Sequence, residues 1–370
     1  MRSFDLFVRI RLASLVALLF VVGRSPKASA QQNPAETKPA APASDRSPAQ
    51  LDSGNNNFGH PLNLDTLTPS TKLVKEDWSV LPVTMPPQYL PGHDDIINTA
   101  IFPDFRRELV QAHWRDNDPI DLYVMLPKGV EKPPVVLYLY SYASKSSELY
   151  KSFDYDKYLV KYGVAAVAFE SALAGDRYHD IAQTKWFVSE LQRSIGTTVH
   201  DVQLVLNYLE KRGDVDMTRV GIFGDGSGAT IAALAAAADP RIKAVDLLNP
   251  WGDWPDWLAE SALISKEERP KFLKPEFLKS VENLDPVKWL PTLRNTRVRL
   301  EYIEKGITVT PAAAMERVEA AAPPNAKIVH YESKQEFFQN VAMKGTSLDW
   351  IKEQLGAQLP TEAATAAKVP

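Results

Sequence analysis

Residues 221–229 read GIFGDGSGA, and this short stretch decides the fold of the chain. The apolar run Arg219–Phe223 leads into it, and an alanine-rich run that ends at Ala238 follows it. The sequence therefore predicts a strand, a turn packed with glycines and a helix, in that order. In an open sheet of alternating strands and helices, such a turn is where ligands bind or chemistry takes place.

The sequence on both sides of this turn alternates between strand-like and helix-like stretches. Two strand-like runs joined through Asn117 and Asp118 predict an antiparallel hairpin, and the later apolar runs are short enough for buried strands. This order predicts an α/β fold with a mostly parallel sheet and helices on both faces. A helical stretch at about 251–283 interrupts the alternation and is predicted to be a small cap insertion. The predicted strands are 107–114, 120–126, 135–140, 164–169, 219–223, 242–248, 298–303 and 326–331, and the predicted helices include 199–211 and 229–238.

Two known motifs combine a strand, a glycine turn and a helix. One is the nucleophile elbow G-x-S-x-G, which holds a serine at the start of the helix. The other is the dinucleotide fingerprint G-x-G-x-x-G/A, which Gly224, Gly226 and Ala229 satisfy, with Asp246 as a candidate ribose ligand. That fingerprint normally lies on the first strand of its domain, whereas about four predicted strands precede this turn. A dinucleotide-binding protein is therefore the minor alternative.

The residues after the turn continue the elbow pattern, with IAAL at 231–234 and DPRIKAV at 239–245. In this layout, roughly residues 107–355 resemble the α/β-hydrolase family, particularly its dienelactone-hydrolase and prolyl-oligopeptidase-like branches. The resemblance implies the α/β-hydrolase fold. It also implies a catalytic triad in the chain order nucleophile, acid, histidine.

The same resemblance leaves all three triad positions vacant. Gly224 and Gly228 fall on the two glycines of the elbow, and Gly226 falls on its serine. The segment that usually ends in Gly-Glu-Lys-Asp ends here in Glu-Lys-Gly, which leaves Gly306 at the position of the acid. Gln335 stands where the family carries its histidine. No catalytic residue is expected on this interpretation.

An active ester, lactone or peptide hydrolase is the main alternative. It would use Ser227 as a displaced nucleophile and His330 as the base, because the chain has six histidines and only His330 lies beyond Ser227. The acid would be Asp253 or Glu304. Shifting the elbow by one residue puts Asp225 where a small residue is required. His330 lies five residues before the usual histidine position, up to about 16 Å away, whereas a base must lie within about 3 Å of its nucleophile.

The turn keeps features that bind ligands without a triad. Backbone N–H groups near Ser227 and near Tyr142 would form an oxyanion hole, and the start of a helix attracts anions. Trp254 and its neighbours Trp251 and Trp257 are candidates for a lid over this site. We therefore expect a small anionic or carbonyl ligand, contacted by Tyr142, Ser227 and Trp254, and no cofactor.

Two loop-like sets combine histidine with carboxylates, but neither predicts a metal site. His93–Asp95 and Asp176–Asp180 lack the spacing of known metal-binding motifs, and both are interpreted as surface loops. The formal net charge of -4 gives no attraction to nucleic acid, which is not expected as a partner. The chain has no cysteine, so it forms no disulfide.

The two ends of the chain differ in composition from the rest. Residues 1–30 have the basic, apolar and small-residue parts of a signal peptide, and the apolar run 12–22 is about half the length that spans a bilayer. Residues 31–57 are predicted to be a disordered linker, 58–356 the hydrolase-fold domain and 357–370 a disordered tail. The chain is expected to be periplasmic or secreted, with no membrane span after cleavage.

These patterns together predict an exported α/β-hydrolase-fold protein that has lost serine-hydrolase activity. Its expected role is binding or scaffolding, with a protein partner that the sequence does not identify.

Overall fold

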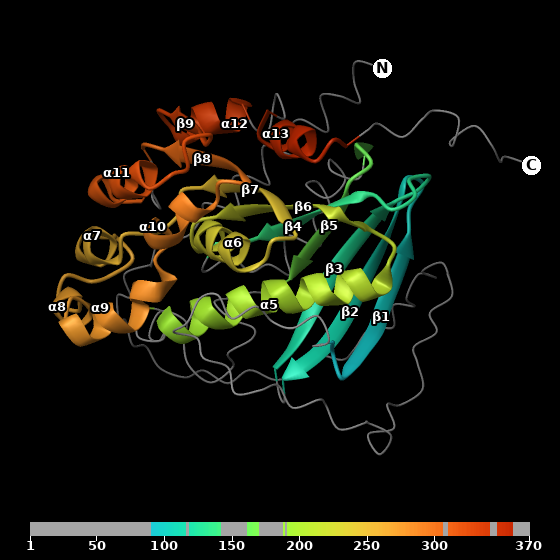
Figure 1. The fold of residues 1–370 in the computed structure, drawn as a ribbon, viewed down its shortest axis with the longest axis horizontal. Coiled ribbons are helices and arrows are strands. Elements are labelled where there is room, and N and C mark those ends of the chain that lie inside the picture. The colour runs from blue at the N-terminus through green and yellow to red at the C-terminus, as the bar shows by residue number, and fades with distance from the viewer. Residues whose placement is uncertain are drawn as a thin grey trace, which may run out of the picture.

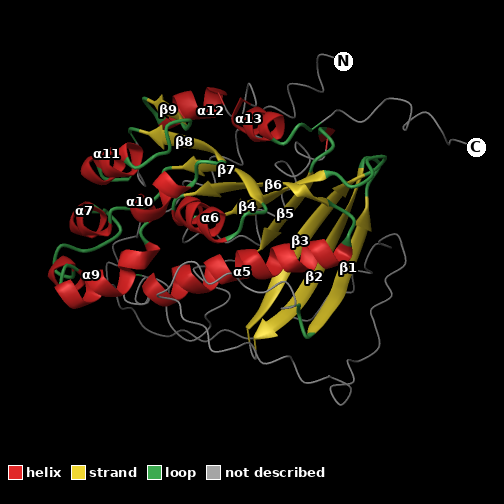
Figure 2. Cartoon of the chain, in the orientation of Figure 1, coloured by secondary structure: helices red, strands yellow, loops and turns green. Residues whose placement is uncertain are grey.

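The computed structural model describes residues 90–115, 118–141, 161–169, 188, 191–305, 310–340 and 346–357. The predicted signal peptide, the linker and residues 358–370 lie outside the described residues, as do Tyr142, Gly306 and the set Asp176–Asp180. The described residues form one sheet with helices on both faces (Figures 1 and 2).

A nine-stranded sheet runs through the described part of the chain, in the order β1-β2-β3-β5-β4-β6-β7-β8-β9. Neighbours from β1 to β3 are antiparallel, as is the pair β3 and β5, and all pairs from β5 to β9 are parallel. The prediction of a mostly parallel sheet with an antiparallel start is confirmed. The strands are β1 (His93–Ile101), β2 (Phe105–Arg115), β3 (Asp118–Pro127), β4 (Pro134–Leu139), β5 (Ala165–Phe169), β6 (Asp216–Asp225), β7 (Ile242–Leu248), β8 (Arg297–Ile303) and β9 (Lys327–Tyr331).

The edge strand β1 is the strand of the sheet that the sequence analysis missed. Its residues His93–Asp95, interpreted as a surface loop, pair in register with β2. That interpretation is wrong in its secondary structure. Ile96, Ile97 and Ile101 are each more than half exposed, so the strand shows no alternation of buried and exposed residues that a pattern search could detect.

Helices cover the two faces of the sheet unequally (Figure 1). One face packs against α5, α6 and the helices α7 to α11, and the other packs against α12 and α13. The α-helices are α5 (Leu191–Arg212), α6 (Ser227–Ala238), α7 (Trp254–Glu260), α8 (Arg269–Phe272), α9 (Pro275–Val281), α10 (Pro286–Trp289), α11 (Ala312–Ala320), α12 (Lys334–Phe338) and α13 (Thr346–Gln354), with short 3-10 turns η3 (Glu282–Leu284) and η4 (Leu290–Thr292).

Helix α5 begins eight residues earlier than the predicted range 199–211. Its first turns carry Ser194, Thr197 and Thr198, which are buried, and the Thr198 hydroxyl donates to the Ser194 carbonyl at 2.8 Å. Leu191 and Ile195 continue the apolar spacing of α5 back to its first residue, but the buried polar residues between them weaken the pattern, and the predicted range began only at Val199.

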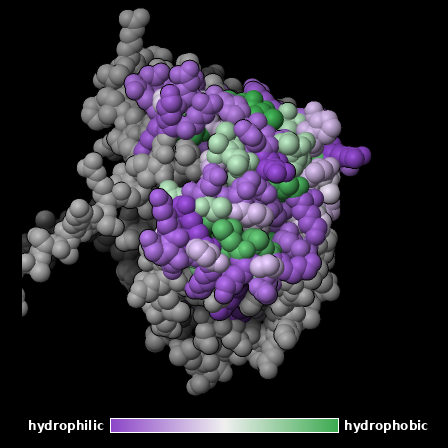
Figure 3. Space-filling view, turned by 90° about the vertical axis from the view of Figure 1, so that its left-hand side faces the viewer, coloured by the Kyte–Doolittle hydropathy of each residue, from purple (hydrophilic) through white to green (hydrophobic). Residues whose placement is uncertain are grey.

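The segment predicted as a cap contains the helices α7, α8 and α9. They lie on the same face as α5 and α6, since α9 contacts α5 and the following α10 contacts α6. Large apolar residues of this segment join the core of that face. The outer surface formed by α7 to α11 is mostly hydrophilic with separate hydrophobic patches (Figure 3).

Candidate functional site

The turn between β6 and α6 has its apex at Gly226. This residue is the N-cap of α6, with φ 55° and ψ -116°, a conformation that side-chain-bearing residues rarely adopt. Its N–H donates to the Leu248 carbonyl of β7 at 2.8 Å, and its own carbonyl accepts from Ala229 and Thr230 at 3.1 and 3.2 Å. The sharp, strained position of the elbow is therefore occupied by a glycine.

The glycines two residues before and after the apex are required by close backbone contacts. A Cβ atom at Gly224 would lie 2.5 Å from the Gly228 carbonyl oxygen. A Cβ atom at Gly228 would lie 2.2 Å from the Leu139 carbonyl oxygen at the end of β4. Moving either backbone segment away would cost free energy, because both contacts are with main-chain atoms. The close packing of the turn therefore explains the spacing Gly224, Gly226, Gly228.

The space in which a side chain at the apex would begin is already filled. A Cβ atom at Gly226 would lie 2.3 Å from the Ser141 hydroxyl oxygen and 3.3 Å from the indole nitrogen of Trp251. Ser141 follows β4, the strand next to β6 in the sheet. The sequence analysis did not name Ser141, because no motif marks it.

Asp225 places a buried carboxyl group directly before the apex. Its residue is 6% exposed. Burial raises the pKa of Asp225 to about 7, and hydrogen bonding from the Gly226 backbone opposes this rise only in part. The sequence analysis treated Asp225 as the variable residue of the motif, and the sequence contains no signal for its burial.

Ser227 and His330 are not brought together. Ser227 is fully buried as the first residue of α6. The ring nitrogens of His330 lie 2.9 Å from a Glu319 oxygen and 3.5 Å from a Glu304 oxygen, and its ring stacks on Tyr302. His330 lies in β9, which β7 and β8 separate from β6, a distance of about 14 Å across three strand spacings.

Gln335, the residue at the family's histidine position, lies in the first turn of α12 and is exposed. Ser333 caps this helix by accepting from the Glu336 N–H at 3.2 Å. Gly306, at the position of the acid, lies outside the described residues. Among the described residues, a glutamine therefore stands at the family's histidine position after β9, and a glycine stands at the serine position of the elbow.

The three tryptophans that were candidates for a lid are core residues. Trp251, Trp254 and Trp257 are between 1% and 4% exposed and belong to the core cluster of the α5 face. Thr230 of α6 fixes this segment, since its hydroxyl donates to the Trp251 carbonyl at 2.7 Å and accepts from the Trp251 N–H at 3.0 Å. The rings therefore attach α7 to the α5 face of the sheet.

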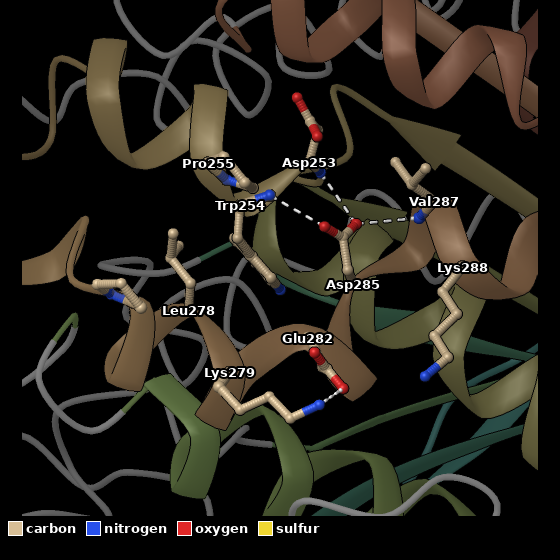
Figure 4. A pocket seen from close by; sticks show the side chains of 10 residues that line it. Asp253, Trp254, Pro255, Leu278, Lys279, Glu282, Asp285, Val287 and Lys288 are labelled. Carbon is tan, nitrogen blue, oxygen red and sulfur yellow. Dashed lines mark hydrogen bonds and ion pairs between the residues drawn. The ribbon is translucent and has the colours of Figure 1, made fainter.

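A pocket of about 480 Å³ opens between α7, α9 and α10. Figure 4 shows Asp285 at its centre, where the carboxylate accepts from the N–H groups of Asp253, Trp254 and Val287 at 2.9 to 3.0 Å. The sequence analysis named Trp254, and Asp253 as a candidate acid, but not Glu282 or Asp285. The lining residues are Asp253, Trp254, Pro255, Pro275, Leu278, Lys279, Glu282, Asp285, Val287 and Lys288.

The acidic groups of this pocket have raised pKa values. Burial raises the pKa of Asp253 to about 6, with further rises from Asp256 and Asp285 and a smaller opposing effect of Arg317. Burial also raises the pKa of Asp285, against the lowering effect of the hydrogen bonds that it accepts. The crowded carboxylates make this end of the pocket electronegative.

Asp246, the candidate ribose ligand, belongs to a buried ion cluster. Both of its carboxylate oxygens accept from the Arg299 guanidinium, which also lies 3.0 Å from a Glu301 oxygen. Asp246 is fully buried, and the Trp350 ring of α13 lies 4.9 Å from the guanidinium carbon. The assignment of Asp246 to a dinucleotide ribose is therefore wrong.

The described residues contain neither a metal-binding cluster nor a helix that could span a membrane. Within them, no three histidine, aspartate or glutamate side chains gather closely enough to hold a metal ion. None of the helices in the same residues has the length and apolarity needed to cross a bilayer.

Two solved structures that are similar to this one are an esterase and a hydrolase. An acetyl xylan esterase from Paenibacillus sp. R4 superposes with a TM-score of 0.53 at 17% identity, covering 70% of this chain and 88% of the esterase. An S-formylglutathione hydrolase from Agrobacterium tumefaciens superposes with a TM-score of 0.53 at 15% identity, covering 71% of this chain and all of the hydrolase. This chain has the α/β-hydrolase fold. Membership of the α/β-hydrolase superfamily, and of one of its branches, stays a prediction.

Comparison by sequence covers a smaller part of this chain than comparison by structure. No protein-family model matches it. The Bacillus subtilis (strain 168) protein named Putative hydrolase YtaP is 32% identical over an alignment of 142 residues, which covers 34% of this chain and 47% of the relative. The chain thus matches about half the length of that relative.

Proposed function

We propose that this chain is an exported α/β-hydrolase-fold protein that binds a small ligand, or serves as a scaffold, without hydrolysing esters. The observation that carries the proposal is the filled apex of the elbow. Residue 226 has no side chain, and the Ser141 hydroxyl occupies the position where a nucleophile's Cβ would begin. Nucleophilic catalysis requires an activated oxygen at this apex, held beside a base.

The arrangement of the other polar groups supports the same proposal. The displaced alternative needs Ser227 within about 3 Å of a histidine nitrogen. The nitrogens of His330 instead face Glu319 and Glu304, three strands away from Ser227.

The proposed ligand at the elbow is a small anionic or carbonyl compound. The Ser141 hydroxyl and the Trp251 indole both carry hydrogen-bond donors beside Gly226. The start of α6 adds the positive end of a twelve-residue helix. Tyr142, which lies outside the described residues, is the further contact proposed from the sequence.

Export is proposed from residues 1–30 alone. Expression of the full chain followed by cell fractionation and N-terminal sequencing tests it. Recovery outside the cytoplasm with a new N-terminus at Gln31 is the expected result. Retention of Met1 in a cytoplasmic fraction would contradict it.

The loss of hydrolysis is tested with a short-chain activated ester. The purified chain is compared with its Ser227→Ala and Ser141→Ala variants and with an active esterase as the positive control. Background turnover is expected for the chain and both variants. Turnover that Ser227→Ala abolishes would show an active hydrolase with a displaced nucleophile, and turnover that Ser141→Ala abolishes would assign the nucleophile to Ser141.

A further inference from the structure

We propose that the pocket between α7, α9 and α10 binds a small zwitterion with an apolar side chain, of the kind represented by a free aliphatic amino acid or a dipeptide. The pocket has a different lining from the elbow, so the inference does not rest on the proposed function. Four features of the pocket, each given below, converge on this class of ligand.

The size and walls of the pocket suit a small amphipathic molecule. Its volume of about 480 Å³ lies within the range of roughly 300 to 1,000 Å³ that is usual for small-molecule sites. Pro255 of α7, Pro275 and Leu278 of α9 and Val287 of α10 form apolar walls. Such walls favour an aliphatic side chain over a fully polar ligand.

The end of the pocket at α7 attracts a positive group. Asp253 and Asp285 line this end, and Figure 4 shows the Asp285 carboxylate turned toward the Trp254 side of the pocket and the Asp253 carboxylate turned away from Asp285. Arg317 of α11 lowers the pKa of Asp253, against the larger raising effects of burial, Asp256 and Asp285. A carboxylate has about four acceptor positions, and Asp285 uses three for backbone N–H groups. An ammonium group would take the remaining one.

A buried donor in the same pocket lacks an acceptor. Trp254 is 1% exposed, and its indole nitrogen has no hydrogen-bond partner among the described residues. Figure 4 shows the indole turned into the space between Asp285, Leu278 and Glu282, with the nitrogen at its inner end. A buried N–H group without a partner costs free energy, which a ligand carbonyl or carboxylate oxygen would recover.

The opposite rim carries positive side chains. Lys279 and Lys288 both line the pocket, and the Lys279 ammonium lies 2.6 Å from a Glu282 oxygen. The Lys279 side chain is 75% exposed, so it can turn from Glu282 toward a ligand at little cost. Acidic and basic groups thus face the same apolar space from two sides, and a zwitterion complements both.

The experiment measures binding of three related compounds to the full-length chain by calorimetry. L-Leucine carries both charges, leucinamide lacks the carboxylate and 4-methylpentanoate lacks the ammonium group. We expect L-leucine to bind and each single-charge analogue to bind at least tenfold more weakly. No heat from L-leucine at about 10 mM, where a dissociation constant near 1 mM is easily seen, overturns the proposal. Equal binding of leucinamide and L-leucine overturns it as well.

A pair of variants locates the site. Trp254→Phe keeps an aromatic ring and removes the N–H group, and we expect it to weaken L-leucine binding roughly 3- to 10-fold. Trp257→Phe is the matched control, since Trp257 is equally buried and does not line the pocket. Its affinity should be unchanged. Equal effects of the two substitutions would place the ligand elsewhere, and the compound series on the unaltered chain tests the ligand class even where a variant fails to fold.

Discussion

Replacing Gly226 by alanine tests whether the apex of the elbow is filled. The backbone at φ 55° and ψ -116° strains a residue with a side chain by about 1–3 kcal/mol. The new Cβ would lie 2.3 Å from the Ser141 hydroxyl oxygen and 3.1 Å from the Ser141 Cβ. The hydroxyl can rotate away but the Cβ cannot, and overpacking of this kind costs typically about 1–3 kcal/mol. Gly226→Ala should therefore lower the free energy of unfolding by about 2–6 kcal/mol.

Gly213→Ala is the matched control for the backbone part of this cost. Gly213 has φ +72°, and no heavy atom lies within 4 Å of a Cβ built there. Its substitution should cost about 1–2 kcal/mol, through backbone conformation alone. Urea unfolding followed by circular dichroism measures both variants. Ser141→Gly in combination with Gly226→Ala should recover the packing part, which a double-mutant cycle separates from the strain.

Equal losses in Gly226→Ala and Gly213→Ala would refute the reasoning. The space beside Gly226 would then be open, and a small side chain could be accommodated at the apex. The case against a nucleophile at that position would lose its physical basis.

Three further substitutions test other parts of the structure. Gly228→Ala should destabilise the chain more than Gly226→Ala, because its Cβ would meet the Leu139 backbone at 2.2 Å, and a milder loss in urea unfolding would contradict the contact. Arg299→Met should cost about 3–5 kcal/mol because it leaves two buried carboxylates without their cation, and an unchanged midpoint would argue against the ion cluster. Asp253 has a folded pKa raised to about 6 from 3.8, so its protonation stabilises the fold fully below pH 3.8 and this contribution is lost as the pH rises through 6. Stability should thus rise less in Asp253→Asn than in the unaltered chain as the pH falls from 7 to about 4, and parallel curves would contradict the shift.

The central strands β4 and β5 could be predicted because they are apolar along their whole length. In β4 and β5 every residue is buried, so short apolar runs between breaks are enough to identify them. The edge strand β1 was not predicted, because its isoleucines are exposed beside its carboxylates and the strand lacks the alternation of buried apolar and exposed polar residues. The start of α5 was not predicted because buried serines and threonines stand between Leu191, Ile195 and Val199 and weaken the apolar pattern there.

The glycine turn of the elbow could be predicted from the sequence, but the presence of the Ser141 hydroxyl beside its apex could not. The positions of Gly224, Gly226 and Gly228 could be recognised from the spacing of the motif. The structure explains that spacing, since close backbone contacts leave no room for a side chain at Gly224 or Gly228. The approach of Ser141 depends on the pairing of β4 with β6, which lie about 80 residues apart in sequence and meet only in the folded sheet. The acidic pocket likewise joins Asp253 to Asp285 across a segment whose fold no local pattern specifies.

The strand order also determines how the chain assembles. β5 lies between β3 and β4, although it follows both in sequence. The antiparallel strands β1, β2 and β3 can pair through local contacts, but β4 cannot join them until β5 has been placed between. Closing these longer loops costs chain entropy before strand pairing offsets that cost with new contacts. We therefore expect the antiparallel part of the sheet to form early and its parallel part to form late. In a refolding experiment with pulsed hydrogen exchange, the amides of β2 and β3 should gain protection before those of β4 and β6.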